Sequence, residues 1–290
     1  MKRTGFEGLL KEHEVGKVEV ERKVDTGQSD YGELMRKYEE VLEAKDYSEI
    51  KTIDDILAPS DINAFLQVTI KYEQHQNYDW RTGKFISQLI QKSYDAGNNG
   101  FVLNTQKVKG VHNLGYKIQG TKERKIELKI EGDAGYNCGS NSKDSTITIE
   151  GNVGNDCGSY SNNSTITIAG NAGYDCGIYS KNSTITIGGN VGDYCGYYSN
   201  NSIITIEGNA GERCGGDSNN STITIGGNVG DLCGSYAHDS TFKISNPELF
   251  YKLVPKILTN GNKVIYTHEQ GIEKTYTKWR WLLWQKWTKH

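Results

Sequence analysis

Six cysteines are the residues of this chain whose type and spacing most suggest chemistry. Each is followed by the next after 19 residues: Cys138, Cys157, Cys176, Cys195, Cys214 and Cys233. Thiols in such a series can form disulfides, bind a metal or act in redox chemistry. No Cys-x-x-Cys pair and no histidine accompanies them, and stacking in register would spread the sulfurs along a line. We therefore predict a structural core column of buried free thiols, with an inter-rung disulfide or metal and redox use as the alternatives.

The cysteines belong to a 19-residue repeat, whose first complete copy is STITIEGNVGNDCGSYSNN at residues 145–163. In its first five residues Ser and Ile alternate with Thr, which is typical of a strand with one buried face. Nineteen residues are too few for a βαβ unit, which needs about 30. An uninterrupted period of this size predicts a coil of short parallel strands, one turn per repeat.

Residues 126–245 resemble the broad class of β-solenoid, or parallel β-helix, proteins. This resemblance implies an architecture and little chemistry. The predicted fold is mainly β: a single-stranded β-solenoid of 19-residue rungs, with an α-helical N-terminal region and a C-terminal cap. The expected domains are a helical module at 1–100, a strand-rich segment at 101–125, the repeats at 126–245, and a cap with a Trp-rich basic tail at 246–290.

The segments that must position the repeats show their own periodicities. Apolar residues at helical spacing predict helices over 29–45, over 60–74 with Ser60 as N-cap, and from Thr82 to Gly97. Alternating residues predict strands at 101–105, 114–120 and 125–132. After the last repeat, the sequence predicts a capping helix over 246–258 and a hairpin over 262–279.

Two polar rows are expected along the coil. The outward threonines form a candidate surface: Thr146, Thr148, Thr165, Thr167, Thr184, Thr186, Thr222 and Thr224. Their T-x-T arrangement resembles the ice-binding surface of insect antifreeze proteins, although threonine is also simply a good residue for an exposed strand. A second row, at Asp144, Asn163, Asn182, Asn201, Asn220 and Asp239, predicts side-chain amides that bond to one another.

The tail is basic and aromatic, and its candidate contact residues are Trp279, Arg280, Trp281, Trp284 and Trp287. The chain has a net charge of -3, whereas residues 131–245 carry 4 basic and 12 acidic residues and residues 246–290 carry 8 basic and 3 acidic. These charges predict attraction between rod and tail, within one chain or between two. Capping or self-association is favoured over membrane contact, and no nucleic-acid partner is expected.

The acidic residues of the repeats fall mostly at turn positions, so no cluster suited to catalysis is recognised. An enzyme would need a site where the helices meet the rod, with His75 or His112 near carboxylates. The N-terminus lacks the apolar stretch of a signal peptide, which predicts a cytoplasmic protein. We expect a non-enzymatic protein without a cofactor, acting as scaffold or interaction surface. A solenoid enzyme and an ice- or surface-binding protein are the alternatives.

Overall fold

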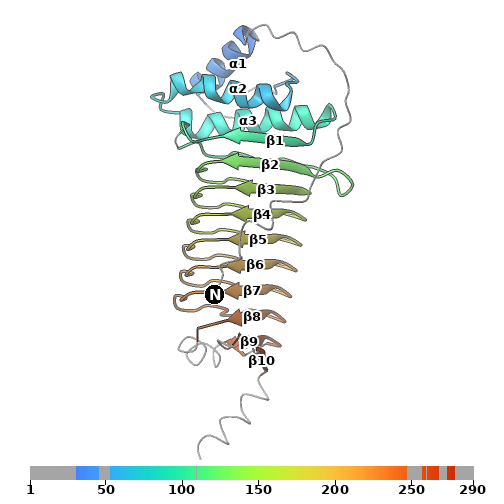
Figure 1. Cartoon of the computed structure of the whole chain (residues 1–290), viewed down its shortest axis with the longest axis vertical. Coiled ribbons are helices and arrows are strands. Elements are labelled where there is room, and N and C mark those ends of the chain that lie inside the picture. Colours follow the sequence, from blue (N-terminus) through green and yellow to red (C-terminus); the bar gives the residue numbers. More distant parts are fainter. Residues whose placement is uncertain are drawn as a thin grey trace, which may run out of the picture.

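The computed structural model describes residues 31–45, 53–108, 110–246, 257–258, 260–267 and 273–277. Strands lie one below the next along a rod, and helices cover one end of it (Figure 1). The chain is mainly β, a parallel β-solenoid of about 7 turns with a few N-terminal helices. The predicted fold class is therefore confirmed for the helices and the rod.

Within the described residues, ten strands form one continuous sheet, in the order of the sequence. Neighbouring strands from β1 to β9 run parallel, and β10 returns antiparallel to β9. Each strand pairs with the next one along the chain, so the connections stay short. The strands are β1 Gly100–Asn104, β2 Ile126–Glu131, β3 Ser145–Ile149, β4 Thr165–Ile168, β5 Thr184–Ile187, β6 Ile203–Ile206, β7 Thr222–Ile225, β8 Thr241–Ile244, β9 Lys263–Thr267 and β10 Glu273–Tyr276.

The pairing register equals the sequence repeat from β2 to β8. Each residue lies beside the one 19 positions further on, as Ile147 lies beside Ile166. Because side chains alternate across a strand, one row faces the interior and the next faces outward. The interior isoleucines of β3 to β7 are at most 1% exposed, and burying each contributes about 2 kcal/mol. This confirms the predicted inward isoleucines and outward threonines.

Two further lines of contact close each rung into a coil. One joins Ala134 to Val153 and continues down the rod, and the other does the same from Lys143 to Asn162. Between these lines the chain turns through residues with positive φ, which in one rung are Asp156, Gly158 and Tyr160. The same three positions have positive φ in every cysteine-bearing rung. The left-handed region is unfavourable for most side chains. Packing against the neighbouring rungs must therefore stabilise Tyr160 in this backbone conformation.

The sheet begins one rung before the predicted repeats. β1 pairs in parallel with β2, and after β1 the residues Asn113 and Gly115 have positive φ, as the corner residues of later rungs do. The Leu114 carbonyl accepts a main-chain N–H from the next rung, as the Cys138 carbonyl does one rung later. Leu114 thus occupies the first position of the cysteine column. The strand predicted at 114–120 is wrong, because this segment forms the sharp corner instead.

In the described part of the chain, three α-helices cover the β1 end of the rod (Figure 1). They are α1 Gly32–Glu43, α2 Pro59–Val68 and α3 Tyr78–Asp95, and a short 3-10 helix, Thr69–Tyr72, follows α2. Their shared core holds the rings of Tyr38, Phe65 and Phe85, with centroids 5.2–5.8 Å apart. The helical module therefore has its own aromatic core and closes the first rung from solvent.

Two of the predicted helix starts are wrong. α2 begins at Pro59 after Ala58, not after a Ser60 cap, because the N–H that proline lacks has no intrahelical partner at the first helical position. α3 begins at Tyr78, one turn before Thr82, whose hydroxyl lies inside the helix and bonds the Tyr78 carbonyl oxygen at 2.6 Å. The predicted end is confirmed, since Gly97 follows α3 with φ +113°.

At the other end, β9 pairs with β8 and extends the sheet, and β10 turns back on it. The predicted hairpin is confirmed in these strands. The capping helix predicted over 246–258 lies mostly outside the described residues. Asn262, which is buried just before β9, donates through its side-chain Nδ2 to the carbonyl oxygens of Ala237 and Ile257 at 2.8 and 3.1 Å. This amide links the last rung to the segment that follows it.

Candidate interaction surfaces of the solenoid

The cysteine column runs through the interior of the rod. All six thiols are free and at most 1% exposed, which confirms the predicted burial. Each sits between two left-handed residues, as Cys157 sits between Asp156 and Gly158. The chain therefore turns sharply on both sides, and a small apolar side chain fits the narrow space inside the corner.

Neighbouring thiols hydrogen-bond along the column. These bonds raise the pKa of Cys157, Cys195 and Cys233 and lower the pKa of Cys176 and Cys214. Burial acts in the raising direction on all five. Among the described residues, no basic side chain acts on these five thiols, so a thiolate there would have no counter-charge.

We expect all six thiols of the native protein to resist the disulfide reagent DTNB. The thiolate is the reactive form, and all six sulfurs are enclosed in the rod, where the reagent cannot reach them. In denaturant the six should react at the rate of ordinary cysteines. The measurement is the release of the coloured thiolate, followed with and without urea. Fast reaction of one or more thiols in the native protein would contradict the packing interpretation.

The threonine rows lie on the outward face of the sheet. Thr146, Thr165 and Thr184 stack in one row, and the eight candidate threonines are half-buried or exposed. Ile203 interrupts this row with its side chain 51% exposed. Above the second row stands Lys129, whose Nζ lies 2.8 Å from a Glu150 carboxylate oxygen and 3.0 Å from one of Glu131. A group of charged side chains therefore lies at the β2 edge of the threonine face.

The polar row that the sequence predicts is confirmed at two places. Asn163 donates its side-chain amide to Asp144, and Asn220 donates to Asn201. All six residues of the row have φ between 46° and 52°, a conformation that Asn and Asp tolerate better than other non-glycine residues. The Asn and Asp residues of this row therefore support the backbone conformation of the corner as well as the contacts between their side chains.

A second and more regular amide ladder was not predicted. The Oδ1 atom of each member accepts the main-chain N–H of the member one rung later at 2.6–2.9 Å, and the members are Asp133, Asn152, Asn171, Asn190, Asn209 and Asn228. Three of them also donate Nδ2 to the preceding Oδ1 at 3.0–3.2 Å. An aspartate fits the first place, because it accepts hydrogen bonds and has no amide protons to satisfy. The recurring Gly-Asn pair of the repeat was the available signal.

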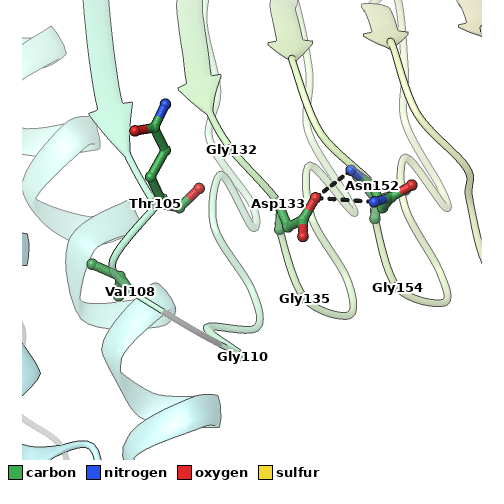
Figure 2. A pocket seen from close by; sticks show the side chains of 11 residues that line it. Thr105, Val108, Gly110, Gly132, Asp133, Gly135, Asn152 and Gly154 are labelled. Carbon is green, nitrogen blue, oxygen red and sulfur yellow. Dashed lines mark hydrogen bonds between the residues drawn. The ribbon is translucent and has the colours of Figure 1, made fainter.

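A cavity of about 640 Å³ opens beside the head of this ladder (Figure 2). The loop at Thr105 and Val108 forms one side, and Asp133 and Asn152 lie opposite, joined by their hydrogen bonds. Its lining is mostly glycine and alkyl groups. Asp133 is the one carboxylate among the described residues that line the cavity, and Thr105, Gln106 and Asn152 supply its other polar side chains.

One corner of the rod carries a row of stacked tyrosines that was also not predicted. The rings of Tyr160 and Tyr179 stack with centroids 4.8 Å apart, and those of Tyr179 and Tyr198 with centroids 4.9 Å apart. The spacing of the rungs matches the distance for ring stacking. All three side chains are exposed. Tyrosine at the same place in three successive repeats was the signal in the sequence.

The two histidines of the enzyme alternative are placed separately. His75 Nε2 lies 3.2 Å from a Glu43 carboxylate oxygen at the edge of the helical module. His112 lies between the rings of Trp80 and Tyr136, and its Nδ1 accepts the Tyr136 N–H at 3.0 Å. Burial lowers the pKa of His112. Within the described part of the chain no contact joins the two, so they form no shared site.

The Trp-rich tail contact, Trp279 to Trp287, lies outside the described residues. Over the described ranges no three His, Cys, Asp or Glu side chains are grouped so as to hold a metal ion. A search of the same ranges for a helix with the length and apolar character to cross a bilayer found none.

The fold defines the chain as a β-solenoid with a helical cap and an inner cysteine ladder. Comparison with models of protein families, with curated proteins and with solved structures gave no match.

Proposed function

We propose that this chain is a non-enzymatic scaffold, which presents rows of identical side chains at fixed spacing to a protein partner or to a second copy. The in-register stacking from β2 to β8 supports the proposal, because it holds every outward row at the rung spacing of about 4.8 Å. Helices cover the β1 end and an antiparallel hairpin lies at the other. The sides of the rod are therefore the extended surfaces available for contact.

The charge pattern favours self-association through the tail. The acidic repeats and the basic segment after residue 245 carry opposite charge, and such charges attract most strongly at low ionic strength. A cytoplasmic location, where the buried thiols would stay reduced, accords with this proposal.

Self-association is tested by sedimentation velocity over a wide range of protein concentration. We expect the mean sedimentation coefficient to rise with concentration at about 50 mM salt and to rise less at about 500 mM, where the Debye length is only a few Å. The charge-reversal variant Lys286→Glu is expected to weaken association at low salt, and Lys122→Glu, outside the tail, serves as its control. A strict monomer at every concentration would exclude the assembly part of the proposal.

A further inference from the structure

A second cavity, of about 210 Å³, lies where the first turns of α3 meet the rod. Trp80 of α3, Tyr116 of the first rung and Tyr160 bring three aromatic rings to its lining. Asn137, Asn141 and Asp156 are among the polar residues that line it. This cavity is separate from the one beside Asp133, and its lining holds a wider range of polar and aromatic side chains.

This cavity exists because the tyrosine row is incomplete. Position 141 precedes Tyr160 by one rung in the same row, and both residues have nearly the same φ, +57° and +56°. One face of the Tyr160 ring is covered by Tyr179, with the two planes only 15° apart. The opposite face points toward the rung that holds Asn141. Asparagine is too short to cover a phenol ring, so this face stays open and borders the cavity.

The polar groups beside this open ring are suited to hydroxyl ligands. Within the described residues, the side-chain amides of Asn137 and Asn141 make no hydrogen bond. The Asp156 residue is half-buried, and this partial withdrawal from water raises the pKa of its carboxyl. Amides offer donors and acceptors together, and a carboxylate accepts two hydroxyl protons. Flat aromatic faces meanwhile favour a ring with apolar C–H groups.

The main chain around the cavity is already paired. The N–H groups of Asn137 and Asn141 donate to carbonyl oxygens one rung further on, and the N–H of Asn113 donates to the carbonyl oxygen of Tyr136. A peptide that adds a strand would need such groups free. The carboxylate of Asp156 repels phosphate. The two nearby lysines, Lys84 and Lys117, hold their Nζ atoms over the Tyr116 ring, 5.6 and 5.2 Å from its centroid, so their charge is directed at this ring. A peptide or a nucleic acid therefore fits this lining less well than a neutral, hydroxyl-rich ring.

We propose that this cavity binds one pyranose ring of an oligosaccharide. The ring stacks on the open face of Tyr160, and its hydroxyls bond to the side chains of Asn137, Asn141 and Asp156. This carbohydrate site goes beyond the scaffold role and does not depend on self-association, so the two can fail separately.

The full chain is tested on an array of immobilised glycans, and every hit is repeated in solution by saturation-transfer difference NMR. We expect saturation to reach the C–H protons of one sugar ring, with a dissociation constant on the order of 1 mM or tighter, as for other small ligands. Absence of binding to every glycan, with soluble oligosaccharides up to about 10 mM, would overturn the proposal. Displacement of the sugar by a proline-rich peptide or an oligonucleotide at lower concentration would also overturn it.

The decisive variant is Asn141→Tyr, which continues the tyrosine row and fills the cavity. The backbone at position 141 already has the conformation that Tyr160 and Tyr179 adopt, so the protein is expected to fold with an unchanged or higher urea midpoint. Binding should weaken at least about tenfold, because the open ring face is covered. Unchanged binding by this variant would refute the site.

The matched control is Tyr236→Ala. Tyr236 stands in the same row much further along the rod, with its side chain 71% exposed. This variant removes a tyrosine from the same type of corner without touching the cavity, so we expect its sugar affinity to equal that of the unchanged protein. Equal weakening by both substitutions would show that the effect is not specific to the cavity and would count against the proposal.

Discussion

Replacement of Ile185 by alanine is expected to lower the free energy of unfolding by about 3–4 kcal/mol. Ile185 is fully buried in β5 and lies in register between Ile166 and Ile204. In a stacked repeat, each rung packs only on its neighbours. The rungs above and below are fixed by their own backbone pairing, so they cannot move inward to close the cavity. The measurement is a urea titration followed by far-UV circular dichroism.

The neighbouring residue provides the control. Thr186 lies on the outward face of the same strand, and Thr186→Ala is expected to change stability by no more than about 0.5 kcal/mol. Equal losses at the two positions would mean that the alternation of inward and outward residues does not govern the stability of the rod.

The second large effect is expected from Gly177→Ala. Gly177 has φ +69°, and an added Cβ would lie 2.5 Å from Cδ1 of Ile185. The left-handed conformation costs a non-glycine residue about 1–2 kcal/mol, and overpacking adds about 1–3 kcal/mol. Together they predict a loss of about 2–4 kcal/mol, again read from the urea midpoint.

A double-mutant cycle separates these two causes. Ile185→Val removes the Cδ1 atom and alone should cost about 1 kcal/mol. In the double variant Gly177→Ala with Ile185→Val, the clash disappears and only the conformational cost remains. We expect the double variant to be at least about 1 kcal/mol more stable than the sum of the two single losses predicts. Additive losses would show that the clash is relieved in another way and that φ alone explains the glycine.

The constant interval between cysteines made the architecture predictable from the sequence. Any insertion would have placed Cys176 and Cys195 out of register, so the period itself indicated stacking. The alternation of Ile147 and Ile149 with threonine then indicated which row is buried. Both signals are local patterns repeated in a fixed frame, and such patterns need no knowledge of distant contacts.

The first rung was missed because it breaks that frame. Leu114 precedes Cys138 by 24 residues instead of 19, although Asn-Leu-Gly at 113–115 matches Asn-Cys-Gly at 137–139. The extra residues form loops outside the corner, so the corner geometry is kept while the period is lost. The carbohydrate cavity was missed for another reason: it combines Trp80 of α3 with Tyr160 of the rod, and no spacing in the sequence relates these two residues.

The aspartates that head the two amide rows have a further consequence. Asp133 and Asp144 begin their rows as acceptors only. Along the Asp133 row, each later asparagine as far as Asn228 donates its main-chain N–H to the Oδ1 atom of the member before it. The beginning of the rod is therefore chemically distinct, whereas its middle is uniform. A 19-residue unit could be inserted or deleted in the middle without changing either end. The length of the rod would then change only by whole rungs of about 4.8 Å each. Duplication or loss of one 19-residue unit in the gene would add or remove one rung.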